Sequence, residues 1–294
     1  MLKNEYLRFL KSKFNFVLIF FMSILVALSY YSTYLDKQEW IKVLNSGAED
    51  VNLAAVEKMV NGYTGVAYFD RFIFGDFYIV FILVALIGFG IHLCSTTFSN
   101  LQSGYGSLLV SRLGYERYIK NLVIAQVLYI FTFILLFHTV LLLGSIAIGG
   151  TGFAQDITTF TRLGDINGIN YIFALTAQII MGPIFVSLVV SLVSLSTPYL
   201  KNKYLIQISP FFVYFIFLFI SSTIGNISPT FGTVTRYFVP DSFLKSVYFN
   251  SISHTSLLDT VLSFVALPLL LLALTIYMYS VNVESYTEDY IVWH

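Results

Sequence analysis

The sequence predicts an all-α integral membrane protein with six transmembrane helices. Only 11% of its 294 residues are charged, whereas a soluble domain usually carries about 25%. A further 57% are hydrophobic, and they cluster in runs long enough to cross a bilayer, which takes about 20 helical residues. So few charges could not cover the surface of a soluble protein of this length. We therefore expect a single transmembrane domain over 1–294.

Residues 1–13 predict an amphipathic helix that lies in the membrane interface. One side of a helical wheel carries Leu2, Tyr6, Phe9, Leu10 and Phe14, and the other side carries Asn4, Glu5, Arg8, Lys11 and Ser12. The first span then covers about 14–34. A cleaved signal peptide is the competing interpretation, but its apolar region would be shorter than this run.

The remaining apolar runs predict five further spans. They lie at about 77–94, 122–148, 171–195, 204–224 and 257–279. Between the first two spans, the polar stretch 35–76 predicts a short helix on the membrane or on neighbouring helices, because its apolar residues recur three and four positions apart. These residues are Leu53, Val56, Val60 and Tyr63.

The distribution of basic residues predicts that both termini are cytoplasmic. The N-terminal segment and the loops on its side of the membrane carry nine Lys and Arg residues, and the other side carries seven. The nine lie in short segments near helix ends, where the positive-inside rule is strongest. An even number of spans returns the C terminus to the same side. The abundance of Phe, Tyr, Ile, Asn and Lys indicates an AT-rich genome. We expect a multi-pass protein of a bacterial cell membrane.

The sequence lacks the short motifs of common enzyme classes. It contains no G-x-x-x-x-G-K-[ST] phosphate-binding loop, no H-E-x-x-H zinc motif and no G-x-S-x-G nucleophile motif. The four histidines are far apart and Cys94 is the single cysteine, which excludes an intrachain disulfide. Lys plus Arg equals Asp plus Glu, so no net charge attracts nucleic acid. We expect a chain that is not an enzyme and holds no metal or cofactor of its own.

His138 and Gln178 are the candidates for an intramembrane polar site. An ionisable residue within a span marks a proton or ion path, and His138 lies in the third predicted span. The alternative, which we favour, is a neutral histidine that hydrogen-bonds to a neighbouring helix. Gln126, Gln178 and Gln207 likewise suit hydrogen bonds between helices better than substrate binding.

The segment between the second and third spans, Phe98 to Lys120, is the most informative one. It reads FSNLQSGYGSLLVSRLGYERYIK. Its apolar residues recur three or four positions apart, which predicts a short amphipathic helix parallel to the membrane. Gly114 then allows a turn. A mere connector needs only a few residues, so a longer structured loop indicates that something docks on it.

This segment resembles the permease of an ABC transporter of the type-2 exporter family. The shared pattern comprises Gly104, Gly106, Leu108-Leu109, Ser111-Arg112, Gly114, Arg117-Tyr118 and Lys120. The resemblance implies that Phe98 to Gly114 forms a coupling helix that docks on a separate ATP-binding subunit. The docking residues that it implies are Phe98, Leu101, Gln102, Tyr105, Leu108, Arg112 and Gly114. It also implies a dimer with a second permease copy or a paralogue, and ATP and Mg bound on the partner ATPase.

By this resemblance the chain is the permease subunit of an ATP-driven transporter that exports a peptide, a lipid-linked molecule or another amphipathic substrate. Two alternatives stay open. One is an ion-coupled secondary transporter, in which His138 or helix breaks at Pro183 and Pro210 would form the ion-coupling site. Such prolines are also common structural features of spans. The other is a non-transporting membrane scaffold or immunity protein.

Overall fold

The computed structural model describes residues 1–46, 52–102, 105–150, 168–200, 202–225, 227, 232, 234–244 and 257–292, and every regular element in these ranges is helical. Six helical segments among them are long and apolar enough to cross a membrane. They are α2 (Phe14–Ser46), the continuous helix α5–η1–α6 (Asp76–Gln102), α8 (Tyr115–Gly149), α9 (Gly168–Ser196), α10 (Lys203–Gly225) and α14 (Leu257–Val292). Each covers one predicted span, so the predicted fold class and the six spans are confirmed.

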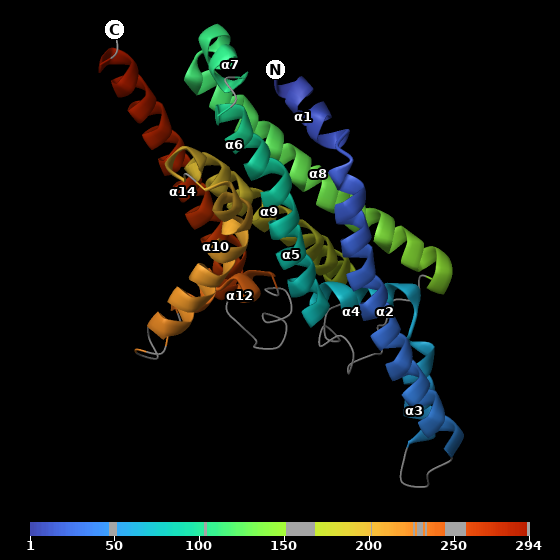
Figure 1. Cartoon of the computed structure of the whole chain (residues 1–294). Helices are drawn as coiled ribbons and strands as arrows, with labels where there is room; N and C mark the ends of the chain where they lie inside the picture. Colours follow the sequence, from blue (N-terminus) through green and yellow to red (C-terminus); the bar gives the residue numbers. More distant parts are fainter. Residues whose placement is uncertain are drawn as a thin grey trace.

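Both termini lie at the same end of the bundle (Figure 1). The N terminus, α7 (Tyr105–Leu113) and the C-terminal end of α14 mark this end, which we call the proximal end. The short helices α3 (Leu53–Asn61), α4 (Gly65–Phe74) and α12 (Pro240–Leu244) lie at the opposite end, which we call the distal end. This layout agrees with an even number of spans. That the proximal end is cytoplasmic is an expectation drawn from its basic residues.

The centre of the bundle is formed by α9 and by the second span, α5–η1–α6. In the most apolar stretch of α9, 72% of the residues are buried, and the share is 56% in the second span but only 22–28% in the other four. Helix α9 packs against α5, α8, α10 and α14. The outer helices expose large apolar side chains such as Phe20 and Phe219, which fit the hydrocarbon of a bilayer.

The second span crosses α10 at Gly90, where the helix widens into the π turn η1 (Gly90–Cys94). A Cβ at Gly90 would overlap the carbonyl of Gln207 and contact the ring of Pro210. A single π turn inside an α-helix is a local bulge that does not end the helix. The chain therefore continues through η1 into α6 (Ser95–Gln102), beyond the predicted end at Cys94.

The N-terminal helix α1 (Leu2–Leu10) packs against α8. The hydroxyls of Tyr6 and Thr132 lie 3.1 Å apart. Most of the predicted apolar side faces the bundle, since Phe9 is buried and Leu2, Tyr6 and Phe14 pack against the core. Two residues depart from the prediction, because Glu5 is buried and Leu10 is 38% exposed. Arg8 lies 2.7 Å from Glu5, and this ion pair neutralises the carboxylate, which allows it to turn inward.

Asn15 holds α1 to the rest of the bundle. Its side-chain amide donates hydrogen bonds to the carbonyls of Phe9 at 3.1 Å and Leu10 at 2.9 Å. Its side-chain carbonyl accepts a hydrogen bond from the hydroxyl of Tyr129 on α8. The last carbonyls of a helix lack partners within the helix. One side chain therefore satisfies the end of α1 and a buried tyrosine together.

At the distal end, the helix predicted within 35–76 is confirmed as α3, and α4 follows it. Asp36 of α2 forms an ion pair with Arg71 of α4, whose guanidinium lies 5.4 Å from the ring centroid of Tyr63. Burial raises the pKa of Tyr63 to about 12, and the positive charge of Arg71 opposes this shift. Helix α4 also approaches α8 closely, because a Cβ at Gly65 would overlap the carbonyl of Ser145.

Replacing Asn15 with alanine should lower the melting temperature in detergent by about 3–10 °C, because the Tyr129 hydroxyl and the Leu10 carbonyl lose their partner and the Phe9 carbonyl keeps only the N–H of Ser12. Tryptic cleavage after Lys11 and Lys13 should also become faster. Asn52→Ala is the matched control, because it removes an asparagine that caps α3 far from these lysines. Cleavage of N15A at the native rate would contradict the role of Asn15.

Candidate functional site

Helix α7 offers a small exposed surface at the proximal end. Val110 is buried and Leu109 packs partly against the core. Leu108 is 61% exposed, and Ser111 and Arg112 are also exposed. Helix α7 is thus anchored on one side by apolar contacts and turns a leucine, a serine and an arginine outward.

Gly114 separates α7 from α8. Its φ is +77°, a backbone conformation that glycine adopts without the steric cost that other residues meet. The predicted turn at this position is therefore present, and α8 begins directly after it at Tyr115.

The predicted docking segment is divided between two helices. Phe98, Leu101 and Gln102 belong to α6, the end of the second span, and not to the helix that carries Leu108 and Arg112. Phe98 is 7% exposed and Leu101 packs partly against the core, so this apolar face meets the bundle. Gln102 is exposed at the end of α6. The side chain of Tyr105, also predicted to dock, lies outside the described part of the structure.

His138 lies on α8 and is fully buried against α5 and α9. Its ring centroid lies 5.7 Å from that of Tyr78 and 5.4 Å from that of Phe81. Neither ring nitrogen completes a hydrogen bond of normal geometry, but the ring lies against the backbone of Ile179. Pro183 has no N–H, so the Ile179 carbonyl lacks its usual donor four residues later. An imidazole N–H can supply that donor, as neighbouring groups do around prolines in other spans.

Tyr78 packs onto the same part of α9. Its side chain is fully buried, and a Cβ at Gly182 would overlap its hydroxyl. The glycine therefore provides the space for the tyrosine. Tyr78 of α5 and His138 of α8 both pack against α9 near Gly182 and Pro183. This arrangement favours the structural interpretation of His138 over a proton path.

The buried glutamines join helices, as predicted. Gln178, fully buried on α9, donates a hydrogen bond to the carbonyl of Leu244, the last residue of α12. Gln126 of α8 donates to the hydroxyl of Thr97 on α6 at 2.9 Å. The predicted polar pair His138 and Gln178 thus lies on facing helices, but Gln178 is engaged with the distal helix α12.

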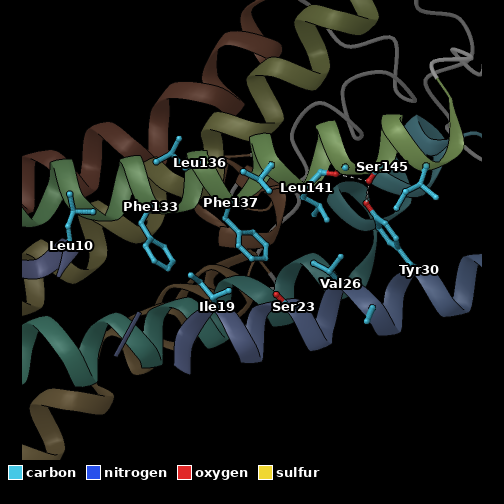
Figure 2. Close-up of a pocket in the computed structure, with 14 residues that line it drawn as sticks. Leu10, Ile19, Ser23, Val26, Tyr30, Phe133, Leu136, Phe137, Leu141 and Ser145 are labelled. Atoms are coloured by element: carbon cyan, nitrogen blue, oxygen red, sulfur yellow. Dashed lines mark hydrogen bonds between the residues drawn. The ribbon is translucent and has the colours of Figure 1, made fainter. Parts of the chain in front are cut away.

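An apolar groove runs between α2 and α8, with a volume of about 700 Å³. Leu10 lies at one end of the groove, and Tyr30 and Ser145, whose hydroxyls are hydrogen-bonded to each other, lie at the other (Figure 2). We call it the α2–α8 groove. Phe137 lines part of the groove, and its ring centroid lies 5.5 Å from that of Phe81 on α5.

The α2–α8 groove was not predicted from the sequence. The available signal was a set of small residues on the two helices, Ser23 and Ala27 on α2 and Gly144 on α8. A Cβ at Gly144 would meet no atom within 4 Å. Small residues also occur where helices touch, so their spacing alone does not distinguish a groove from a contact.

Replacing Gly182 with alanine should lower the melting temperature by about 3–10 °C, because the added methyl overlaps the Tyr78 hydroxyl in a close-packed site. Adding Tyr78→Phe should recover part of this loss, and Ile82, 2.9 Å from the added carbon, should limit the recovery. Gly144→Ala is the control, since its methyl enters open space. If G182A melted at the same temperature as G144A, the packing described here would be wrong.

Among the residues described above, no group of three or more His, Cys, Asp or Glu side chains could hold a metal ion. No family model, curated protein or solved structure matches this chain. The chain is a helical membrane protein with six candidate spans.

Proposed function

We propose that this chain is the permease subunit of an ATP-driven ABC exporter whose ATPase is a separate protein. The observation that supports this best is α7, a short helix between the second and third spans at the end of the bundle that carries both termini. It exposes Leu108 and Arg112. In the proposal this surface docks on the ATPase.

The composition of the α7 surface supports a protein partner. Arginine is among the residues that dominate binding energy at protein interfaces, where apolar neighbours exclude water. Arg112 lies four residues after Leu108, so the two share one face of the helix. The docking surface that we propose is therefore Leu108, Ser111, Arg112 and the neighbouring Gln102. It leaves out Phe98, which is buried, and Leu101, which packs partly against the core.

The sequence supports a division of labour between subunits. This chain has no phosphate-binding loop, so ATP and Mg would bind the partner ATPase. A second permease copy or a paralogue would complete the transporter. The cargo that we propose is a peptide, a lipid-linked molecule or another amphipathic compound, as the resemblance to the type-2 exporters implies.

The ion-coupled alternative depends on His138. The imidazole faces aromatic rings and the α9 backbone, where it can supply the hydrogen-bond donor that Pro183 lacks. A carrier would need a group that exchanges protons or ions with both sides of the membrane. The scaffold alternative differs from the permease in predicting a membrane partner and no ATPase.

We expect the tagged chain, purified in mild detergent from its own host, to bring with it a stoichiometric ATPase that contains a phosphate-binding loop. Arg112→Glu should then weaken ATPase binding about tenfold or more, because it reverses a charge at the centre of the docking surface. Leu108→Ala should act in the same direction. Both side chains are exposed, so the melting temperature should stay within about 1 °C of the native value.

Lys203→Glu is the matched control. Lys203 is an exposed basic residue at the start of α10, and it is predicted to lie on the same side of the membrane as α7. It should retain the ATPase. Reproducible absence of any ATPase from the intact native chain would overturn the permease proposal. Native binding by R112E and L108A together would instead show that the ATPase docks elsewhere.

A further inference from the structure

We propose that the α2–α8 groove binds one acyl chain of an anionic phospholipid, with the phosphate held beside Lys11 and Lys13 at the proximal end. This site does not rest on the permease proposal, because it requires neither an ATPase nor a cargo. It uses the shape of the groove, the chemistry of its lining and the charges at its two ends.

The groove has the dimensions of a lipid chain. Its lining on α8 extends from Phe133 to Ile148, which are 15 residues apart and hence about 22 Å apart at 1.5 Å per residue. The hydrocarbon of one leaflet is about 15 Å deep, half of a core of about 30 Å, so the groove is long enough to hold a whole acyl chain. Its volume of about 700 Å³ lies within the range of sites that enclose small molecules.

The lining suits a hydrocarbon chain and offers little to a polar ligand. Its walls are mainly aliphatic and phenyl side chains, such as Ile19, Val26 and Phe133. The polar groups at the distal end, Tyr30 and Ser145, are hydrogen-bonded to each other. They therefore need no partner from a ligand, and a chain methyl group can lie against them.

The charges at the two ends differ in sign. Leu10 lines the proximal end, and the exposed Lys11 and Lys13 follow it directly in the chain. Residues 1–35 contain four basic side chains and one acidic side chain, and that acid, Glu5, is paired with Arg8. Toward the distal end, residues 35–76 contain seven acidic and four basic side chains. An anionic head group is therefore attracted to the proximal end and repelled from the distal end.

The same charges argue against a second copy of the chain as the occupant. Two copies inserted in the same orientation would place their basic proximal ends at the same depth in the membrane. Like charges brought together across an interface are unfavourable. Anionic lipid instead neutralises Lys11 and Lys13, and basic sites beside transmembrane helices bind anionic head groups in this way.

The test uses the full-length chain in mild detergent and native mass spectrometry with phosphatidylglycerol or phosphatidylcholine carrying identical acyl chains. We expect one phosphatidylglycerol to be retained in preference to phosphatidylcholine. The double variant Lys11→Gln, Lys13→Gln should weaken phosphatidylglycerol binding about 30-fold. Its control is Lys37→Gln, Lys42→Gln, which removes two lysines from the distal part of α2 and should bind normally.

Gly144→Phe tests the groove itself, because its ring enters the open space beside Gly144. It should abolish retention of the lipid, whereas Ser222→Phe, on an exposed position of α10, should not. A phosphatidylglycerol carrying a photoreactive group near the chain end should label α2 or α8 between the ends of the groove in the native chain.

Three outcomes would overturn the proposal. The first is equal retention of the two lipids, or native binding by the K11Q/K13Q variant, which changes exposed residues only. The second is labelling spread evenly over the exposed faces of α10 and α14. The third is a change of oligomeric state in G144F without a change in bound lipid, which would assign the groove to a second copy of the chain.

Discussion

The bundle depends on the close packing of α5 and α8 against α9 around Gly182 and Pro183. Backbone polar groups in a membrane interior need partners within the protein, and Pro183 removes one donor from α9. His138 lies against the backbone that lost this donor, and Tyr78 fills the space that a side chain at Gly182 would need. These contacts fix the depth of the second, third and fourth spans relative to one another. The positions of α7 at the proximal end and α4 at the distal end follow from that alignment.

The number and limits of the spans could be predicted because the length of an apolar run is a local property of the sequence. The same holds for α3, whose apolar spacing predicted a helix. Contacts between distant residues could not be predicted, and Asn15 with Tyr129 is the clearest case, because they are 114 residues apart. The division of 98–114 between α6 and α7 was also missed. Apolar spacing places Phe98 and Leu101 on one face of a helix, but it does not say whether that face meets a partner or the bundle.

Helix α1 carries the Glu5–Arg8 ion pair, and Lys11 and Lys13 follow it directly in the chain. The sequence predicted an amphipathic helix in the membrane interface, with Glu5 on its polar side. The ion pair of Glu5 with Arg8 and the cap from Asn15 accompany the packing of α1 against α8. Leu10 then closes the proximal end of the α2–α8 groove, and Lys11 and Lys13 are placed beside it by the short connection to α2. The position of these lysines thus depends on a hydrogen bond to Tyr129, deep in the third span.

Helix α8 is the element that links the two proposed sites. It begins directly after Gly114, at the end of α7, and from Phe133 onward it forms one wall of the groove. Between these points its Gln126 is bonded to α6 and its Tyr129 to Asn15, and further along His138 is enclosed by α5 and α9. A helix bonded at several points to different neighbours can move as one unit only if those neighbours move with it. A partner docked on α7 would therefore act on the bundle through α8, and a lipid chain seated between α2 and α8 would oppose any motion that closes the groove.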